Sequence, residues 1–260
     1  MVLVLMKGLL AKMLNELLNQ NLDDVVKEIS DMDDMYQGNK DHYFSVGNSA
    51  LQCINNAILL ANKDLSSIGN ILDFPCGFGR VLRILKVAFP TAAITGCDLV
   101  QEGVDFCEEQ FGSRAVYSDK NLDNVNLNET YDLIWVGSLL THLDKSQWKK
   151  FLGFFNKLLN PGGILLFTTQ GRYSASLLRN KESTYGLETD EKINNLLNDY
   201  ENEGFGFSNY YHSDDYGITL SVPSNVIKQI ESQSNLQLLM CLERGWDSHQ
   251  DVYACVKNEN

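Results

Sequence analysis

The chain has 260 residues, which is enough for one α/β domain with an insertion or with a small additional helical part. Hydrophobic residues make up 44% of it and charged residues 21%, as in ordinary globular proteins, so the composition argues against disorder. The net charge of −13 repels phosphate backbones and no run of Lys or Arg offsets it, so the sequence favours small molecules, sugars or proteins over nucleic acid as partners.

The first twenty residues, MVLVLMKGLLAKMLNELLNQ, begin with apolar residues as a signal peptide does. The apolar run is only six residues long, Lys7 and Lys12 interrupt the apolar residues after it, and there is no A-x-A-like cleavage site. We therefore expect an amphipathic helix here, the first of two helices over residues 8–62. Nowhere does the chain reach the roughly 18 consecutive apolar residues of a membrane span, so we expect no membrane partner.

From about residue 69 onward, short apolar segments alternate with helical ones. Strands are predicted at 69–74, 92–98, 114–118, 131–136 and 163–169, and helices at 79–88, 101–111 and 145–159. Strands that alternate with helices form a mostly parallel sheet with helices on both faces, so the predicted fold class is α/β. The predicted organisation is an N-terminal helical extension at 1–65 and one domain at 66–260.

Residues 170–222 break this alternation. They contain a predicted helix, TDEKINNLLNDYENEG, and a stretch rich in aromatic residues and glycine, so we interpret them as an insertion or lid near a ligand. Pro223 begins a further helix that reaches about residue 234. The chain ends with predicted strands at 236–244 and 251–257, and their short connection makes them antiparallel neighbours.

The cysteines and histidines are scattered along the chain. No two of the six cysteines have the CxxC spacing, and most of them lie in apolar runs, as buried reduced thiols of a cytosolic protein do. Because the four histidines are scattered too, we expect no metal site. The sequence therefore predicts a cytoplasmic location.

The stretch ILDFPCGFGR, residues 71–80, has the pattern of a strand that runs into a glycine-containing loop before a helix. This order is typical of nucleotide-binding turns, but the dinucleotide fingerprint GxGxxG is incomplete because Leu82 stands in place of its third glycine. Pro75 also removes one N–H donor that a phosphate at a helix N-terminus would use. A P-loop is excluded because no GK[ST] comes after the loop, which therefore indicates a ligand without a cradled phosphate.

S-adenosylmethionine fits these residues better, because it joins a nucleoside to an amino acid without any phosphate. Small residues at Cys76, Gly77 and Gly79 permit the loop to pass close to the methionine part. The ribose needs a carboxylate at the end of the next strand, and Asp98 stands there, nineteen residues after the last glycine.

With these residues the chain resembles the class I S-adenosylmethionine-dependent methyltransferases, from about residue 69 to 169 and again in the final hairpin. ILDFPCGFGR matches their first motif, apart from Pro75 in place of its first glycine, and YDLIWVGSLL and LNPGG match the fourth strand and the turn before the fifth. The resemblance implies S-adenosyl-L-methionine as cofactor and a seven-stranded sheet of order 3-2-1-4-5-7-6 with strand seven antiparallel. It implies that Asp98 binds the ribose and that Asp119 lies near adenine. The implied cofactor-binding residues are Asp73, Pro75, Cys76, Gly77, Gly79, Asp98, Leu99, Asp119, Gly137 and Ser138.

Four residues are candidates for the chemistry and for the acceptor. His142 comes after the fourth strand, where ligands of open α/β sheets bind, and a histidine with an ordinary pKa near 6.5 can take a proton from a hydroxyl group. It is the candidate catalytic base, and the alternatives are that it lines the pocket wall or caps the next helix. His249 in the terminal hairpin and Tyr211 and His212 in the insertion are candidate substrate contacts. The alternatives are a hairpin held by its own hydrogen bonds, and surface or lid packing.

The acceptor is constrained mainly by motifs that the chain lacks. VGSL stands after the fourth strand instead of the [DNS]PP[YFW] motif of DNA amino-methyltransferases, and Pro75-Cys76 is in the wrong loop for a cytosine C5 enzyme. FPCGFGR, GSLLTHL and GWDSHQDV faintly resemble bacterial methyltransferases encoded beside glycan-synthesis genes. We predict a methyltransferase acting on a small molecule or glycan, at oxygen rather than nitrogen. The alternatives are a non-catalytic protein that binds S-adenosylmethionine, and an NAD-dependent oxidoreductase, which the missing third glycine disfavours; the oligomeric state stays open.

Overall fold

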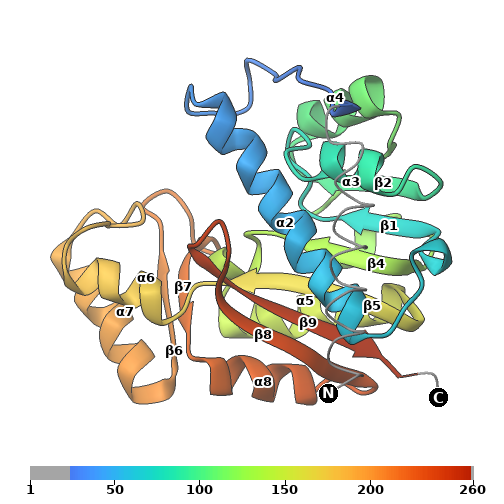
Figure 1. Ribbon diagram of the computed structural model, residues 1–260. Helices are drawn as coiled ribbons and strands as arrows, with labels where there is room; N and C mark the ends of the chain where they lie inside the picture. The colour runs from blue at the N-terminus through green and yellow to red at the C-terminus, as the bar shows by residue number, and fades with distance from the viewer. Residues whose placement is uncertain (1–23, 259–260) are drawn as a thin grey trace, which may run out of the picture. The chain divides into compact units, whose positions relative to one another are not determined.

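The computed structural model describes residues 24–258, and the first predicted helix lies almost entirely outside them. The described chain forms two compact units, and the boundary along the sequence falls between Trp135 and Val136. Figure 1 labels the helices and strands of each unit. The predicted boundary at residue 65 between a helical extension and a second domain stays a prediction.

The first unit begins with an irregular segment and continues with α2 (Lys40–Leu60), the second of the two predicted N-terminal helices. The side chain of Asn39 caps α2 by accepting the N–H of His42, and its buried face includes Val46, Ala50 and Ile54. After α2 come η2 (Leu65–Ser67), β1 (Asn70–Asp73), α3 (Leu82–Ala88), β2 (Ala93–Asp98), α4 (Gln101–Phe111), β3 (Arg114–Tyr117), η3 (Leu122–Asn124) and β4 (Tyr131–Val136).

The strands of the first unit are parallel neighbours. β1 pairs with β2 on one side and with β4 on the other, and β2 pairs with β3. Burial on both faces explains the apolar runs IL in β1 and LIWV in β4, whereas the edge strand β3 has no buried residue. Because the strands are parallel, their carboxyl ends meet at one edge, so the loop after Asp73 and the end of β2 at Asp98 lie beside each other.

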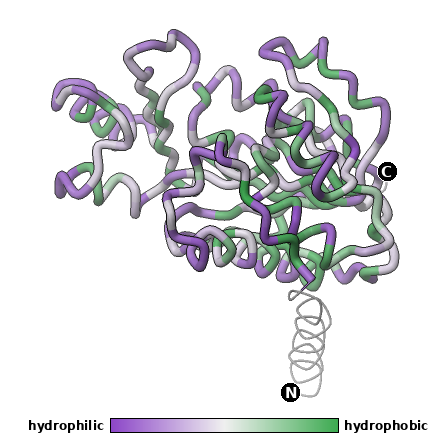
Figure 2. Tube along the Cα trace, turned by 90° about the horizontal axis from the view of Figure 1, so that it is seen from above, coloured by the Kyte–Doolittle hydropathy of each residue, from purple (hydrophilic) through white to green (hydrophobic). Residues whose placement is uncertain are grey.

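The second unit contains the end of the sheet and the insertion. Its elements are η4 (Leu140–His142), α5 (Lys145–Leu158), β5 (Leu159–Thr169), α6 (Arg172–Arg179), α7 (Asp190–Glu203), β6 (Phe205–Asn209), β7 (Gly217–Ser221), α8 (Pro223–Glu231), β8 (Leu236–Trp246) and β9 (Gln250–Lys257). β9 pairs antiparallel with both β5 and β8. Figure 2 colours the chain by the hydropathy of its residues, from purple for hydrophilic to green for hydrophobic.

The hydrogen-bonded strand order is β3-β2-β1-β4-β5-β9-β8. Once β6 and β7 are set aside as strands of the insertion, this is the predicted order 3-2-1-4-5-7-6 with an antiparallel seventh strand. The α/β fold class and the Rossmann-like methyltransferase sheet are therefore confirmed.

Residues 170–222 form α6, α7 and the antiparallel pair β6–β7. They enclose an apolar cluster of their own, made of Ala175, Leu178, Leu187, Leu196, Leu197, Tyr200, Ile218 and Leu220. The N–H of Ser221 donates to the carbonyl of Gln170 at 2.8 Å, so the segment starts and ends at one point. The hairpin β6–β7 is a difference from the sequence-based expectation, which gave this stretch no strands.

The helix predicted at 79–88 begins three residues later, at Leu82. Gly77 and Gly79 have positive φ angles of 51° and 77°, which no helix can include, so the chain turns until Arg80 before it can coil. The fifth strand also begins earlier than expected, at Leu159, so it includes the LNPGG segment, in which Gly162 has a φ of +69°.

Candidate functional site

The loop after β1 brings the backbone close to its surroundings at one glycine and leaves space at another. A Cβ atom on Gly79 would lie 2.5 Å from the ring of Phe111, so no larger residue fits there. A Cβ atom on Gly77 would meet nothing within 4 Å. The Phe74–Pro75 peptide at the start of the loop is cis. The loop therefore packs tightly at Gly79 and is open at Gly77.

The backbone donors of this loop are used mostly within the protein. The N–H of Cys76 donates to Cys97 at 3.1 Å, that of Gly77 to Oδ2 of Asp98 at 2.7 Å, and that of Gly79 to Cys76 at 2.9 Å. Pro75 has no N–H to offer. A phosphate held by such a loop needs several N–H groups directed at it, and this loop directs its donors elsewhere.

Helix α4 supports the loop from one side. A Cβ atom on Gly103 would lie 2.6 Å from the carbonyl oxygen of Gly77, and the thiol of Cys107 lies 3.6 Å from the same oxygen. The thiol of Cys76 contacts that of Cys107, and this contact together with burial raises the pKa of Cys76 well above its ordinary value. The Cys76 thiol is therefore a protonated packing group, which fits the small, close residues that the loop requires.

Two buried carboxyl groups lie at the ends of β1 and β2. Asp73 is 1% exposed, and its Oδ1 has no hydrogen-bond partner among residues 24–258. Burial first, and then the charge of Asp98, raise the pKa of Asp73 well above the ordinary range. Asp98 is 7% exposed; burial raises its pKa, although its oxygens accept the N–H groups of Gly77 and Val100. An unsatisfied buried oxygen is costly unless a ligand or water supplies a donor.

An apolar surface comes directly after Asp98. Leu99 is 56% exposed and Val100 is 45% exposed, which is unusual for large aliphatic side chains next to a buried acid. Asp119 lies after β3 and is exposed, and its Oδ1 accepts the N–H of Asn121 at 2.7 Å in a local turn. At one edge of its strands, the first unit thus combines Gly77, where a Cβ atom would have free space, the buried Asp98 and the exposed apolar side chain of Leu99.

In the second unit, the chain turns sharply as it leaves β4. Gly137 is buried, and Ser138 has a φ of +57°, a left-handed conformation that is uncommon outside glycine. The N–H of Ser138 donates to Oγ1 of Thr168 at 2.8 Å, the Thr168 hydroxyl donates to Oε1 of Gln250 at 2.6 Å, and Nε2 of Gln250 donates to Oγ of Ser138 at 3.0 Å. Because a backbone N–H can only donate, this closed ring fixes the direction of each hydrogen bond.

Sequence reasoning missed Thr168 and Gln250. Thr168 stands near the end of β5 and Gln250 at the start of β9, so both lie at the sheet edge where β4 ends. This position is the signal that could have identified them. Recognising it required the register of β5 and β9, in which Thr168 lies opposite Val252. Such a pairing is a property of the folded sheet and not of the local sequence.

His142 lies in η4 and is surrounded by aromatic side chains of the insertion. Its ring is stacked on that of Tyr216 with centroids 4.8 Å apart, and the hydroxyl of Tyr210 lies 3.2 Å from Nδ1. Nδ1 also lies 2.8 Å from the carbonyl of Gly217, which identifies it as the protonated nitrogen. Burial lowers the pKa of His142, so the ring is neutral at pH 7 with its lone pair on Nε2.

Comparison with known proteins adds to this geometry. A family model described as "Methyltransferase domain" matches residues 72–165, the segment that contains the glycine loop, Asp98 and the end of β4. Residues 72–165 therefore match a methyltransferase domain, and the strand order of the sheet is the one that the resemblance to class I S-adenosylmethionine-dependent methyltransferases implied.

Three similar proteins show the extent of the likeness. A malonyl-[acyl-carrier protein] O-methyltransferase of Acetivibrio thermocellus is 26% identical over 148 residues, 55% of this chain and 50% of that protein. The tRNA N(3)-methylcytidine methyltransferase Mettl2 of Drosophila melanogaster is 26% identical over 135 residues, 48% of this chain and 42% of that protein. The crystal structure of an S-adenosylmethionine-dependent methyltransferase from Clostridium acetobutylicum superposes with a TM-score of 0.54 at 15% identity, covering 85% of this chain and 93% of that one.

The chain spans about half the length of the curated relatives it matches, or less. The two curated relatives act on different acceptors by their names, one of them a tRNA. Membership of the methyltransferase domain therefore leaves the acceptor undetermined.

The substrate contacts expected from the sequence occupy two different environments in the second unit. His249 is half-buried in the hairpin β8–β9, where Nε2 lies 3.0 Å from the hydroxyl of Tyr185 and the ring meets Tyr173 edge-on. Tyr211 is 73% exposed and contacts His212 in the β6–β7 connection. Within the insertion, the tyrosines that reach His142 are Tyr210 and Tyr216.

A buried acid lies where the insertion joins the sheet. Asp251 is 1% exposed and accepts the N–H of Arg244 at 2.8 Å, whereas its Oδ2 has no hydrogen-bond partner among residues 24–258. Burial raises the pKa of Asp251 to about 6. A Cβ atom on Gly171, the residue before α6, would lie 2.2 Å from this Oδ2, so only glycine fits there.

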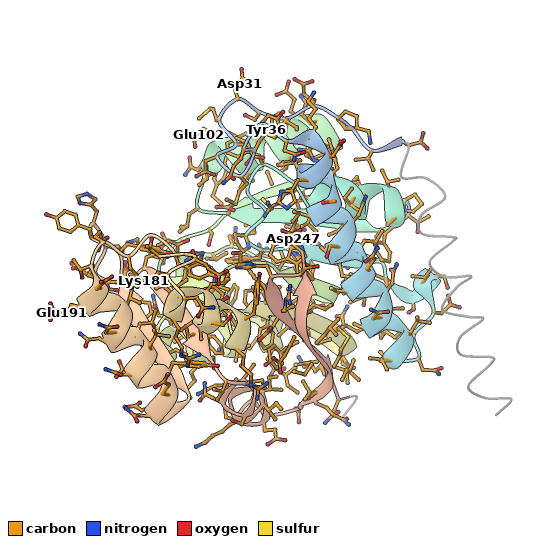
Figure 3. The ribbon with its side chains drawn as sticks, turned by 60° about the vertical axis from the view of Figure 1, so that its left-hand side comes forward. Asp31, Tyr36, Glu102, Lys181, Glu191 and Asp247 are labelled. Carbon is orange, nitrogen blue, oxygen red and sulfur yellow. The ribbon has the colours of Figure 1, made fainter. Side chains whose placement is uncertain are left out.

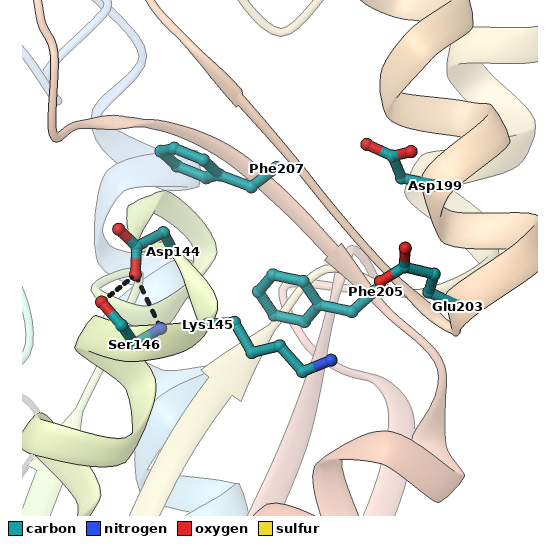
Figure 4. A pocket seen from close by; sticks show the side chains of 7 residues that line it. All are labelled: Asp144, Lys145, Ser146, Asp199, Glu203, Phe205 and Phe207. Carbon is teal, nitrogen blue, oxygen red and sulfur yellow. Dashed lines mark hydrogen bonds between the residues drawn. The ribbon is translucent and has the colours of Figure 1, made fainter.

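An open hollow of about 350 Å³ lies elsewhere in the second unit, between the start of α5, the end of α7 and β6 (Figure 4). Its lining residues are Asp144, Lys145, Ser146, Asp199, Glu203, Phe205 and Phe207. None of the residues expected at the site from the sequence lines it. Asp144 there forms a capping box with Gln147, which accounts for its position without a ligand.

Two further observations concern metals and membranes. Within the described part of the chain, no group of three or more His, Cys, Asp or Glu is arranged to hold a metal ion. Among residues 24–258, no helix has the length and apolar character needed to cross a bilayer. The cysteines all have free thiols, and only Cys241 is exposed.

Proposed function

We propose that this protein binds S-adenosylmethionine at the loop after β1 and transfers its methyl group to an oxygen atom of a small molecule or glycan. The observation that carries the proposal is the hydrogen bond from Gly77 to Asp98, which holds a strand-end carboxylate beside an open glycine. The loop uses its backbone donors within the protein, which suits a nucleoside ligand without a phosphate and disfavours NAD.

The residues of the first unit fit the cofactor. Asp98 carries carboxylate oxygens that can accept further hydrogen bonds from ribose hydroxyls, since each oxygen has two lone pairs and donates none. Leu99 offers exposed apolar surface beside it for a planar base. The unsatisfied Oδ1 of Asp73 can accept a hydrogen bond from a ligand donor or from a water bound with it.

We assign the remaining proposed cofactor contacts to the loop itself and to two later strand ends. Pro75, Cys76, Gly77 and Gly79 bring the backbone close to the ligand, and Asp119 lies on the adenine side. Gly137 and Ser138 supply the corner after β4, where the ring with Thr168 and Gln250 holds the backbone in one conformation.

When bound, S-adenosylmethionine supplies a methyl group that a positively charged sulfur has already activated for displacement. The protein then has to align an acceptor behind the methyl group and exclude water, and such alignment alone contributes several powers of ten to a rate. A hydroxyl acceptor also has to lose its proton.

We propose that His142 takes this proton at Nε2. Burial keeps the ring neutral at pH 7, and the carbonyl of Gly217 binds the proton on Nδ1, so Nε2 is the basic nitrogen. The aromatic rings of Tyr210 and Tyr216 hold the imidazole in one orientation. Tyr211, His212 and His249 remain proposed substrate contacts, and His249 is the one already held by a second side chain, Tyr185.

Oxygen is favoured as the acceptor atom because the similar malonyl-[acyl-carrier protein] enzyme is by name an O-methyltransferase. A tRNA acceptor is the second candidate, on the strength of the Drosophila relative. The net charge of −13 weighs against it, because RNA binding depends on neutralising phosphates. The free thiols support a reducing, cytoplasmic location.

The decisive experiment combines calorimetry with a transfer assay. Titration with S-adenosylmethionine, S-adenosylhomocysteine and NAD should give heat of binding for the first two and none for NAD; binding of NAD alone would refute the proposal. Methyl-labelled cofactor is then incubated with hydroxylated small molecules, sugars, carboxylates and tRNA. Transfer of the label to an oxygen atom of a small molecule or glycan supports the proposal. Transfer to tRNA would mean that tRNA, and not a small molecule or glycan, is the acceptor. Cofactor binding without any transfer indicates a non-catalytic binding protein.

A further inference from the structure

Arg83 is a charged side chain in the interior of the first unit that the proposed reaction does not use. It belongs to α3 and is 1% exposed. A guanidinium group has five N–H donors, and burying it without acceptors for them would be strongly unfavourable. The acceptors of its N–H groups therefore indicate which segments Arg83 holds in place.

All five N–H donors of Arg83 have acceptors. Nε donates to the carbonyl of Gly79 at 2.9 Å, and Nη2 donates to the carbonyl of Phe78 at 3.0 Å and to the hydroxyl of Tyr43 at 3.4 Å. Nη1 donates to the carbonyls of Val26 and Glu28, at 3.2 and 2.6 Å. Two of these acceptors are in the glycine loop, one is in α2, and two are in the segment that precedes α2.

This preceding segment, residues 24–36, is named the N-terminal strap (Figure 1). Most of it is exposed, and Figure 3 shows Asp31 projecting from its outer side. Its contacts include the buried side chains of Val25 and Asp33 and the ring of Tyr36, which meets that of Tyr43 in α2 edge-on. A segment of this kind, with little regular structure, depends on specific side-chain contacts for its position.

Tyr43 connects the strap to Arg83 a second time. Its hydroxyl accepts from Arg83 and donates to Oδ2 of Asp33 at 2.6 Å, so a buried cation and a buried anion are joined through one phenol. Arg83 also lies over the ring of Phe111 with 4.8 Å to the centroid, and Phe111 is the side chain that encloses Gly79. The strap, the guanidinium and the loop are thus parts of one hydrogen-bonded and packed network.

We propose that Arg83 is a positioning residue for the cofactor loop, and that through it docking of the N-terminal strap and binding of the cofactor favour each other. Arg83 fixes the carbonyls of Phe78 and Gly79, which sets the backbone on either side of the open glycine region. It does so only while its other donors are satisfied by Val26, Glu28 and Tyr43. This inference rests on the proposed function of the loop as the S-adenosylmethionine site.

The coupling is reciprocal by thermodynamic necessity. If a docked strap raises cofactor affinity by some factor, bound cofactor stabilises the docked strap by the same factor. A role for Arg83 in stability alone predicts no such relation, because it would change unfolding without linking these two local events. The two roles therefore differ in a measurable quantity.

The test uses the full chain and three variants. Tyr43→Phe removes the hydroxyl between Asp33 and Arg83 and leaves the ring, and Arg83→Lys keeps the charge but loses the five-donor fork. Lys86→Gln is the matched control, because Lys86 lies one turn further along α3 and donates to the carbonyl of Gly112, outside this network. The readouts are amide hydrogen exchange over residues 24–36 and 76–80, and the dissociation constant of S-adenosylhomocysteine by calorimetry.

In the unmodified protein, S-adenosylhomocysteine should slow exchange in the strap at least fivefold. Tyr43→Phe should speed exchange in both segments and weaken S-adenosylhomocysteine binding about fivefold, and Arg83→Lys should weaken it at least tenfold. The KM for S-adenosylmethionine should rise with kcat at saturation preserved, and Lys86→Gln should match the unmodified protein.

The proposal is overturned if Tyr43→Phe loosens the strap while loop exchange and ligand affinity stay unchanged, or if bound ligand leaves strap exchange unchanged. If Arg83→Lys does not fold, Tyr43→Phe decides by itself. If the unmodified protein binds no S-adenosylhomocysteine, the proposed function fails separately. Exchange in the ligand-free variants then shows whether strap and loop are connected through Arg83.

Discussion

Gly77 donates its backbone N–H to Oδ2 of Asp98 across 2.7 Å, which joins the loop after β1 to the end of β2. The other oxygen of Asp98 accepts the N–H of Val100 at 2.9 Å, so the carboxylate organises two backbone segments at once. A carboxylate can serve both and still accept from a ligand, whereas no neutral side chain of the same shape can.

Asp98→Asn should therefore weaken S-adenosylmethionine binding at least tenfold. The N–H of either Gly77 or Val100 would then face the amide NH₂ group, which is itself a donor. Leaving a buried donor without an acceptor costs about 1–3 kcal/mol. Calorimetric titration measures the effect. Asp105→Asn is the control, because Asp105 is exposed and accepts from Tyr117 at the surface of α4. Equal affinities for both variants would contradict the role given to Asp98.

Gly103→Ala should also weaken cofactor binding, although residue 103 is no expected ligand contact. The added methyl group would lie 2.6 Å from the carbonyl oxygen of Gly77, so α4 and the loop would have to separate. The control is Gly153→Ala in α5, where the nearest atom would be Oε1 of Gln233 at 3.4 Å. That control should gain about 0.5–1 kcal/mol of stability, because alanine is the better helix former. Thermal unfolding and cofactor titration of both variants check the pair.

His142→Ala should lower turnover at least a hundredfold while cofactor affinity stays within a few-fold, as expected for loss of a general base. Because burial lowers the pKa of His142, the rate for the intact enzyme should rise with pH below about 6.5 and be constant above it. Initial rates between pH 5 and 8 with saturating cofactor measure this. His42→Ala serves as the comparison, since His42 is exposed in α2 and has no proposed role at the site. If the rate of the His142→Gln variant falls at low pH in the same way as that of the intact enzyme, His142 is not the base.

Asp251 should make the protein less stable as pH rises from about 4 to about 6. Its pKa is raised from 3.8 to about 6 in the folded state, so across this range the folded chain binds more protons than the unfolded chain. The stabilisation present below pH 4 is lost as pH increases through 6, by an amount on the order of 2 kcal/mol. Asp251→Asn should remove this part of the dependence, and urea unfolding at pH 4.5 and pH 7 measures the difference. Parallel pH curves for the two proteins would show that Asp251 is not responsible.

The sequence was sufficient for the features that depend on local order. The strands that alternate with helices, the glycine loop and the acid at the end of β2 all have signals within about 30 residues, and the strand order came from the resemblance. The antiparallel strands at the end of the chain were predicted because a six-residue connection leaves no room for a crossover.

The features that the sequence could not reveal depend on contacts between distant segments. Gln250 meets Ser138 across 112 positions, and Arg83 meets Val26 across 57, so neither has a local signal. The β6–β7 pair was missed because its glycines disfavour strands, although its aromatic residues favour them. Its strands form because Gly206 lies against the backbone of Leu196 in α7, where a Cβ atom would approach to 2.3 Å.

The hydrogen bond between Ser221 and Gln170 also has a consequence for how such proteins diversify. Since the segment between these residues leaves the sheet and returns to it at one place, its length can change with little entropic penalty, because loop-closure cost grows only with the logarithm of length. It has its own apolar cluster, and its contacts with the rest of the second unit include those of Gly171 with Asp251, of Tyr185 with His249 and of Tyr216 with His142, so a replacement has to keep these residues. Grafting the corresponding segment of a relative between Gln170 and Val222 is therefore a practical route to new acceptor specificity on an unchanged scaffold.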